Sequence, residues 1–326
     1  MSKQEKSQLN INNKSRFIVM DCNSIIHRAF HALPMLTTKT GKTVNAVYGF
    51  LLVFFKVLKE FQPEFLAACF DVPGPTFRHK EYKEYKAKRP PAPQELYDQI
   101  PIIKEILKNL TVPIYEKEGF EGDDLIGTIA NLIEKKQVFP KPDIIIVSGD
   151  TDLLQLVDEN IRVYLLKRGV KETVLYDKKL VKEKYKLEPE QLIDFKSLKG
   201  DPTDNIPGVT GIGEKTAIFL IQEFGNIENL YENLKEKTEK VQKLNKKIVD
   251  ILLKYEDQAF FSKKLVKIEK YVPIDFTLEN CRRKKYNKDK VIEILEDLGF
   301  NSLINKIPFE SDSLKSESQN NLKLFN

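Results

Sequence analysis

The sequence lacks tryptophan and contains only three cysteines and three histidines among its 326 residues. The cysteines show no zinc-binding spacing, which favours buried thiols in a reducing cytosol over a disulfide framework. They are Cys22, Cys69 and Cys281. The histidines are too few and too close in sequence to form a catalytic or metal-binding constellation. Packing or surface roles are therefore expected for His27, His31 and His79.

Long apolar runs are absent as well. No stretch reaches the roughly 18 apolar residues that a membrane-spanning helix requires. The first 14 residues are polar and contain no apolar core, which excludes a secretory signal. The sequence therefore predicts a cytoplasmic protein without a membrane partner.

The charge of the chain is unevenly distributed. Its length and its 31% of charged residues are typical of a globular protein with one large domain or two moderate ones. Nine carboxylates fall in five short clusters, and leaving them out raises the formal net charge from +5 to +14. An acidic pocket on a basic body suits a polyanion that must contact metal ions, which favours nucleic acid. Charge alone supports a lysine-rich solvated surface equally well.

Two regions with different patterns follow one another. From residue 16 to about 178, short apolar runs alternate with helical patterns, which predicts an α/β fold with a parallel sheet and helices on both faces. In this region a strand is expected at 161–166 and helices at 44–61, 96–110 and 124–135. From 179 onward helices are expected at 189–199, 214–224, 226–234, 241–255, 256–266 and 288–306. Residues 1–15 and 311–326 are predicted to be a disordered extension and a disordered tail.

The acidic clusters stand where predicted buried strands end. Asp21, Asp71 and Asp150 each follow an apolar run. Because the carboxyl ends of parallel strands meet at one edge of a sheet, these side chains are expected to converge. Like charges this close require counter-cations, and hard oxygen ligands suit Mg²⁺ or Mn²⁺. The candidate metal ligands are Asp21, Asp71, Glu121, Asp123, Asp124, Asp150, Asp152, Asp201 and Asp204.

A single aspartate after a strand is more often a turn residue or a helix cap than a metal ligand. Five clusters, three of them at strand ends, favour the metal-site interpretation. Asp150 and Asp152 fall on one side of an extended backbone, and Asp201 and Asp204 share one face of a helical turn. Two metal ions in such a site can bind a phosphodiester, activate water and stabilise the leaving oxygen.

The sharpest local motif is the glycine-rich segment 208–217. A tight turn there leads into a helix from Glu214, whose free backbone N–H groups suit a phosphate, and Lys215 adds a positive charge. The segment resembles the helix–hairpin–helix motif, which holds a duplex backbone without reading its sequence. A plain helix–turn–helix corner is the alternative.

A basic segment at 77–89 contains six Lys or Arg and two Glu, interleaved with two Tyr. Basic residues can follow a nucleic-acid backbone while aromatic rings stack on unpaired bases. A flexible clamp over the carboxylates, spanning 77–93, is therefore expected, and a solvated basic helix is the alternative. The second basic run, 282–285, is less specific and is interpreted as surface.

These motifs occur together, and in the same order, in one known family. Over about residues 16–310 the chain resembles the 5′ nuclease domain of bacterial DNA polymerase I, of the flap endonuclease family. The matching stretches are 19–21, 30–33, 46–50, 70–71, 77–79, 85–86, 121–124, 150–152, 200–205 and the 208–217 hairpin. The resemblance implies a PIN-like 5′ nuclease core at 16–178 and a helical DNA-binding domain at 179–310, with a helix–hairpin–helix at 200–224. The chain ends about where the polymerase portion of this family would begin, so it is expected to be either a free-standing exonuclease or an N-terminal fragment. The polar tail after Phe309 favours the free-standing protein.

The resemblance also implies an activity. It implies a 5′–3′ exonuclease and flap endonuclease that acts on nicked, gapped or 5′-flap DNA and on RNA primers, with two Mg²⁺ or Mn²⁺ ions. The implied role is primer removal in replication and repair, by a monomer with a functional link to a separate DNA polymerase. A K⁺ ion among the hairpin carbonyls is implied too.

Residue roles follow from the same resemblance. One metal would be served mainly by Asp21, Asp71, Glu121 and Asp123, and the other by Asp150, Asp152, Asp201 and Asp204, with Asp124 near both. Lys86 and Arg89 would be catalytic residues at the scissile phosphate. DNA-binding roles are implied for Arg78, Tyr82, Lys83, Gly208, Gly211, Gly213, Lys215 and Thr216.

Two other functions compete with this one. A ribonuclease on a similar fold is disfavoured by the hairpin, because small ribonucleases of that kind generally lack such a duplex clamp. A junction-binding module without catalysis is disfavoured by the complete set of carboxylates.

Overall fold

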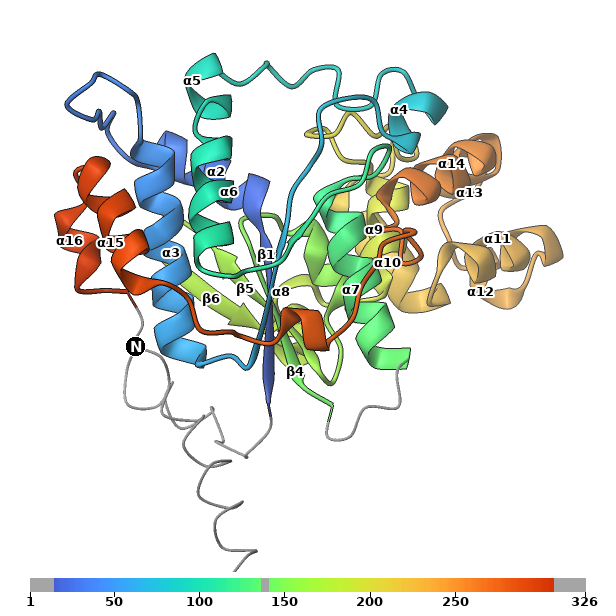
Figure 1. The fold of residues 1–326 in the computed structure, drawn as a ribbon. Coiled ribbons are helices and arrows are strands. Elements are labelled where there is room, and N and C mark those ends of the chain that lie inside the picture. Colours follow the sequence, from blue (N-terminus) through green and yellow to red (C-terminus); the bar gives the residue numbers. More distant parts are fainter. Residues whose placement is uncertain (1–14, 136–140, 308–326) are drawn as a thin grey trace, which may run out of the picture.

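The computed structural model describes residues 15–135 and 141–307 (Figure 1). A six-stranded sheet lies at its centre, in the order β3-β2-β1-β4-β5-β6. The strands are β1 Arg16–Asp21, β2 Phe65–Cys69, β3 Ile114–Tyr115, β4 Asp143–Ser148, β5 Ile161–Leu166 and β6 Thr173–Tyr176. The first five pair in parallel, which confirms the predicted α/β fold, and β6 is antiparallel to β5. The short turn at 167–172 explains the antiparallel edge, since parallel neighbours need a longer crossover.

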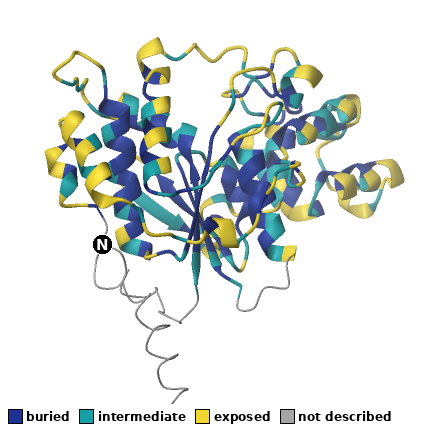
Figure 2. Ribbon diagram, in the orientation of Figure 1, coloured by how far each residue is buried: buried dark blue, intermediate teal, exposed yellow. Residues whose placement is uncertain are grey.

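Helices cover both faces of the sheet, which is why the strands are apolar at nearly every position. In β1, Phe17 and Val19 pack into one hydrophobic core, while Ile18 and Met20 pack into another. Figure 2 shows the central strands as buried between the helices, whereas the edge strand β6 is mainly of intermediate burial. The helices up to the end of the sheet are α2 Cys22–Ala32, α3 Asn45–Phe61, α4 Phe77–Glu81, α5 Gln94–Tyr97, α6 Ile100–Asn109 and α7 Gly122–Lys135, with the 3-10 turn η1 Asp152–Leu156.

The helical region follows β6 and lies on the α7 side of the sheet (Figure 1). Its elements are α8 Lys178–Tyr185, α9 Gln191–Lys199, α10 Glu214–Phe224, α11 Ile227–Glu236, α12 Glu239–Gln242, α13 Lys246–Lys254 and α14 Glu256–Val266. The 3-10 turn η2 Glu279–Cys281 and the helices α15 Lys288–Asp297 and α16 Asn301–Ile304 complete the described chain.

Three helices predicted as continuous are divided in the structure. The helix expected at 96–110 breaks before α6, because Pro101 has no N–H with which to continue the hydrogen-bond ladder. The one expected at 241–255 breaks where the side chain of Asn245 accepts from Lys247 N and caps α13. The last one, expected at 288–306, ends after α15 at Gly299, which adopts a left-handed conformation with φ +74°.

The end of the described chain returns to the sheet. Val291, Leu295 and Leu303 pack into the same core as α3 and α6, so α15 and α16 cover the α/β core and not the helical region to which the sequence assigned them. The segment before α15 crosses the sheet edge, where Arg282 pairs with Phe65 in an isolated bridge and stacks on its ring at 4.7 Å. The basic run 282–285 therefore begins with a residue that ties this segment to β2.

No helix within 15–135 or 141–307 is long and apolar enough to cross a membrane. The two segments predicted to be disordered, 1–15 and 311–326, lie outside the described residues except for Ser15.

Candidate metal and nucleic-acid site

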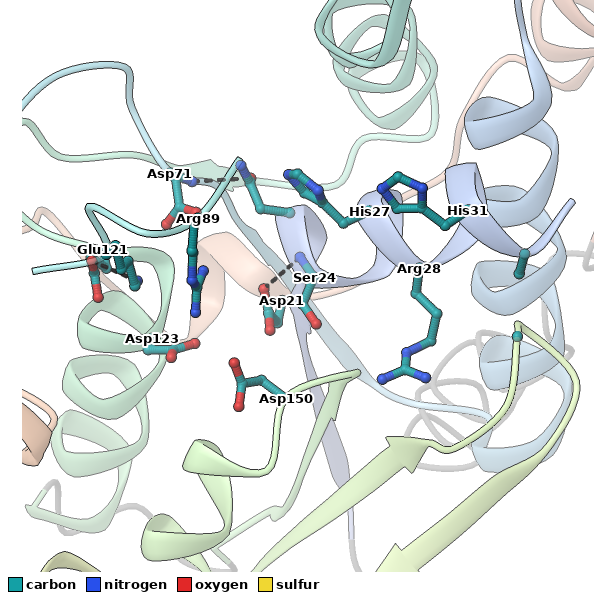
Figure 3. A pocket seen from close by; sticks show the side chains of 14 residues that line it. Asp21, Ser24, His27, Arg28, His31, Asp71, Arg89, Glu121, Asp123 and Asp150 are labelled. Carbon is teal, nitrogen blue, oxygen red and sulfur yellow. Dashed lines mark hydrogen bonds and ion pairs between the residues drawn. The ribbon is translucent and has the colours of Figure 1, made fainter. Parts of the chain in front are cut away.

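Five of the predicted ligands line one open cavity of about 590 Å³ at the carboxyl edge of the sheet. Asp21 ends β1, Asp71 follows β2 and Asp150 follows β4. Glu121 and Asp123 come from the start of α7. Figure 3 shows Asp21, Asp123 and Asp150 facing one another across this space. The structure thus brings together side chains that are up to 129 residues apart in the sequence, from Asp21 to Asp150.

Local hydrogen bonds fix these carboxylates. Asp21 caps α2 by accepting from Ser24 N at 3.2 Å, and its second oxygen accepts from Ser148 Oγ at 2.5 Å. Asp71 accepts from Gly122 N at 2.6 Å, so the free N–H groups at the start of α7 face this site. Glycine suits position 122, because a Cβ there would lie only 3.3 Å from the Asp71 carboxylate.

The negative charge of this cavity is incompletely compensated. Burial, with further contributions from Asp71 and Asp150, raises the pKa of Asp21 from 3.8 to about 7. Desolvation and the charges of Asp21 and Asp150 raise the pKa of Asp123 well above its ordinary value. Neither Asp21 nor Asp123 has an ion-pair partner in the described part of the chain. Such a site is completed by a cation.

The donor set fits a hard divalent ion. Carboxylate oxygens are the ligands that Mg²⁺ and Mn²⁺ prefer, and the uncompensated charge supplies the attraction. In the described ranges, no three acidic, histidine or cysteine side chains are close enough together to enclose an ion. The carboxylates would therefore have to move closer together to coordinate an ion directly.

Neutralising one of these carboxylates is expected to stabilise the metal-free protein. Because the folded state holds the proton of Asp21 more tightly than the unfolded chain does, this group stabilises the fold below about pH 4, and its contribution is lost as the pH rises through about 7. In EDTA at pH 8, we expect Asp123→Asn to raise Tm by about 4 °C, equivalent to about 1–2 kcal/mol. In 10 mM Mg²⁺ the wild type should gain stability and the variant should gain less. Thermal denaturation measured by circular dichroism at pH 5 and pH 8 tests this, and a variant less stable than wild type in EDTA would contradict it.

The remaining predicted ligands occupy different surroundings. Asp152 and Asp201 line a neighbouring cavity of about 260 Å³, where both contact Lys196. Asp204 is 8% exposed and is not part of the lining of either cavity. Its carboxylate accepts hydrogen bonds from Arg89 and from Tyr85 Oη, the latter at 3.2 Å. The arrangement departs from the expected division of ligands, because Asp150 lies with Asp21 and Asp123 and not with Asp152, and because Asp204 lines neither cavity.

Asp124 and Arg78 are paired with each other behind the cavity. Asp124 is fully buried and is not part of the cavity lining. Two Arg78 nitrogens donate to its two oxygens, each at 2.8 Å, and Glu121 N and Glu269 N donate to the same carboxylate. Arg78 is 2% exposed and also donates to Leu265 O and Lys267 O. The expectations of a metal ligand at 124 and a DNA contact at 78 are therefore replaced by a buried ion pair that joins α4, α7 and the end of α14.

The basic clamp is held against the carboxylates in this structure. Lys86 Nζ lies 2.8 Å from Glu121 Oε1 and 3.9 Å from Asp204, and Arg89 pairs with Asp204. Lys86 has a left-handed backbone, with φ +55°, and its N–H bonds to Asp204 O. Tyr85 is buried and its hydroxyl bridges Glu121 and Asp204. Tyr85 was not among the predicted site residues, although it alternates with the basic residues of the clamp.

The rest of the clamp faces outward. Tyr82 is half-buried, with its ring 5.5 Å from that of Phe261, and Lys83 is exposed. Both side chains are therefore accessible to a nucleic acid.

The glycine hairpin joins α9 to α10. Gly208 has φ +60°, and a Cβ there would lie 2.2 Å from Gly200 N. Its N–H donates to Ser262 Oγ at 3.1 Å, and its carbonyl accepts from Gln258 at 2.5 Å. Gly208 is therefore buried and structural, whereas Gly211, Gly213 and Lys215 are exposed around the start of α10 and Thr216 is half-buried.

Two glycine substitutions distinguish the buried, structural Gly208 from the exposed Gly213. Gly208→Ala is expected to destabilise the protein by about 2–4 kcal/mol, because it combines a left-handed backbone with overpacking. Gly213→Ala should stay within about 0.5 kcal/mol of wild type, since φ is −90° and nothing lies within 4 Å of the added Cβ. Urea denaturation compares the two variants. Equal stability of both would show that the hairpin packing is not as described.

A second basic area was not predicted from the sequence. A cavity of about 600 Å³ borders the first and shares Arg28 with it. Arg28 donates to Lys167 O at 2.6 Å and to Gly149 O at 2.8 Å, and Lys167, Arg168 and Lys184 also line this cavity. These basic residues come from α2, the β5–β6 turn and α8, so no run of like charges in the sequence could have identified them.

Two family models match the chain over most of its length. Residues 16–186 match the 5′–3′ exonuclease N-terminal resolvase-like domain, and residues 187–289 match the 5′–3′ exonuclease C-terminal SAM fold. The chain belongs to the 5′–3′ exonuclease family. The first match contains all five carboxylates of the large cavity, and the second contains the hairpin and both of its helices.

Curated relatives of this 5′–3′ exonuclease family member are longer proteins. DNA polymerase I of Bacillus subtilis (strain 168) is 39% identical over 313 residues, covering 96% of this chain and 34% of that protein. DNA polymerase I of Caldicellulosiruptor bescii is 42% identical over 294 residues, covering 90% of this chain and 33% of that protein. The chain spans about a third of the length of these relatives.

Solved structures agree on the fold. The 5′-exonuclease of bacteriophage T5 with bound zinc aligns with a TM-score of 0.64 and 19% identity, covering 89% of this chain and 96% of that one. Flap endonuclease-1 from Methanococcus jannaschii aligns with a TM-score of 0.55 and 19% identity, covering 90% of each chain. The expected 5′ nuclease fold with a helical C-terminal region is confirmed.

Proposed function

We propose that the chain is a divalent-metal-dependent nuclease that hydrolyses DNA phosphodiesters at free 5′ ends, nicks and 5′ flaps. The convergence of Asp21, Asp71, Glu121, Asp123 and Asp150 on one open cavity, in a member of the 5′–3′ exonuclease family, carries this proposal. The T5 flap endonuclease, a structural neighbour, has been crystallised with DNA and metal ions.

Two Mg²⁺ or Mn²⁺ ions are proposed. Asp21, Asp71, Asp123 and Asp150 would hold the first, and Asp152 and Asp201 the second. When bound, such ions supply positive charge that activates the attacking water and stabilises the leaving oxygen.

The basic residues bind and orient the substrate. Lys86 and Arg89 would exchange Glu121 and Asp204 for the scissile phosphate, which offers them a stronger charge-assisted hydrogen bond. Tyr82 can stack on an unpaired base, and Lys83 can follow the backbone. The turn at 208–213 and the start of α10, with Lys215 and Thr216, would hold the duplex through its phosphates, with K⁺ among the hairpin carbonyls.

The proposed cellular role is removal of RNA primers and flaps in replication and repair. We propose a cytoplasmic monomer that is functionally linked to a separate DNA polymerase.

The deciding experiment compares four labelled substrates with Mg²⁺ and with EDTA: a 5′-flap duplex, a nicked duplex, single-stranded DNA and single-stranded RNA. Mg²⁺-dependent cutting at the flap junction and the nick is expected. If the protein bound the flap junction tightly but did not cut it, the protein would be a DNA-junction binding module. Preferential cutting of single-stranded RNA would indicate a ribonuclease.

A further inference from the structure

The smaller carboxylate cluster already contains a positive charge supplied by the chain. The Lys196 ammonium contacts Asp152 and lies 2.7 Å from Asp201 Oδ2. The three side chains are between 15% and 21% exposed, so water screens this contact only partly. Lys196 comes from α9 and Asp152 from the start of η1, so the ion pair joins two segments that are 44 residues apart.

The large cavity is compensated differently. Lys86 pairs there with Glu121 at 2.8 Å and lies 3.9 Å from Asp204. Asp21, Asp123 and Asp150 form no ion pair with a basic residue in the described ranges. The two parts of the site therefore differ in charge compensation before any metal ion binds.

One ammonium cannot neutralise two carboxylates. Asp152 and Asp201 both contact the Lys196 ammonium, so two carboxylate groups share a single positive charge. The cluster of Asp152, Asp201 and Lys196 therefore attracts a divalent ion, although Lys196 already contacts its carboxylate oxygens.

We propose that the Lys196 ammonium occupies the second cation position in the DNA-free protein, and that a divalent ion enters between Asp152 and Asp201 only when this ion pair opens. The inference rests on the proposed two-metal nuclease function. An ammonium and a metal ion would compete for the same carboxylate oxygens, and holding both at contact distance would place like charges together. The adjoining cavity of about 260 Å³ provides room for the displaced side chain.

Substrate binding would favour this exchange. The hairpin that is proposed to hold the duplex packs directly on the residue before Asp201, since a Cβ at Gly208 would lie 2.2 Å from Gly200 N. A DNA phosphate brought to this place offers Lys196 another anion. The first ion would therefore bind to the free protein, whereas the second would bind together with DNA.

Titration of the full chain with Mn²⁺ alone, without DNA, tests the proposal. Isothermal calorimetry or electron paramagnetic resonance would count the ions and give their Kd values. We expect one ion to bind wild type tightly and a second weakly, and Lys196→Gln to lower the second Kd at least about tenfold, as competition for shared ligands requires. Lys199→Gln is the matched control, because Lys199 lines the same cavity but pairs with Glu214 at 3.2 Å.

Lys196→Arg extends the test to a variant that keeps the charge and the ion pair. Because guanidinium pairs with carboxylates more strongly than ammonium does, the second Kd should be equal to that of wild type or higher. Tighter binding of the second ion by this variant would count against the proposal even if the glutamine variant did not fold.

Several results would overturn the inference. Equal Mn²⁺ affinities of wild type and Lys196→Gln would do so, whatever the number of bound ions. An equal gain in Mn²⁺ affinity in Lys199→Gln would also do so, because it would reflect the lower positive charge of the protein and not the loss of one ion pair. Weaker binding of the second ion in Lys196→Gln would mean that Lys196 arranges the ligands. The readout is independent of cleavage, so failure of the proposed nuclease activity is distinguishable from failure of this inference.

Discussion

Replacing Asp150 with asparagine is expected to lower the rate of Mg²⁺-dependent DNA cleavage at least about 1,000-fold, which corresponds to about 4 kcal/mol of transition-state stabilisation. Asp150 lies across the large cavity from Asp21 and Asp123, and it is one of the charges that raise the pKa of both. Asparagine has nearly the same shape and can still accept the hydrogen bond from Asp152 N, which is 2.9 Å from Asp150 Oδ1. The loss should therefore come from charge at the metal position and not from unfolding.

The measurement is single-turnover cleavage of a 5′-flap duplex, together with the Kd for the same DNA in EDTA. The hairpin and the clamp are unchanged in the variant, so the Kd should stay within about threefold of wild type, or less than 1 kcal/mol. Asp250→Asn, on an exposed position of α13, is the matched control and should cleave like wild type. If Asp150→Asn cleaved DNA at a rate near that of wild type, the large cavity would not be the catalytic site.

Arg78→Met is expected to destabilise the protein by about 3–5 kcal/mol, because it leaves the fully buried Asp124 without its cation. The same substitution would remove the bonds from Arg78 to Leu265 O and Lys267 O, which tie α4 to the end of α14. Urea denaturation measures the loss. The exposed neighbour Lys80 gives the control, since Lys80→Met should change stability by less than about 0.5 kcal/mol.

A second substitution distinguishes a buried ion pair from a DNA contact. The double variant Arg78→Met/Asp124→Leu should recover a large part of the lost stability, because replacing both charges with apolar side chains removes the unpaired buried carboxylate. If Arg78→Met weakened DNA binding while leaving the free energy of unfolding unchanged, the structural assignment of Arg78 would be wrong.

Much of the site could be predicted from the sequence, because the location of its residues in the fold depends on local sequence patterns. Buried parallel strands are short apolar runs, so the residues that follow them, Asp21, Asp71 and Asp150, could be placed at one sheet edge. Helix α10 was also located by its glycine turn, and the expected range 214–224 is the observed one. Helix boundaries set by a proline or a capping asparagine were missed inside continuous helical patterns.

Charged residues were harder to assign, because sequence does not show which side of a segment is buried. Arg78 and Lys83 belong to the same basic run, yet Arg78 is 2% exposed and Lys83 faces solvent. The partner atoms of Arg78 include a carbonyl that is 187 residues away. Lys196 stands in an ordinary helical pattern, and only packing places it between Asp152 and Asp201.

Hydrophobic periodicity and the positions of strand ends were enough to predict the class of fold, the edge of the sheet that bears the site and the residue types available there. How the charges are paired depends on the packing of distant segments. Asp124 pairs with Arg78, Asp201 with Lys196 and Glu121 with Lys86, while Asp21 and Asp123 have no ion-pair partner within residues 15–135 and 141–307. The strength of an ion pair decreases with the distance between its charges and depends on their burial. This distance and this burial are set by contacts between segments that are far apart in the chain.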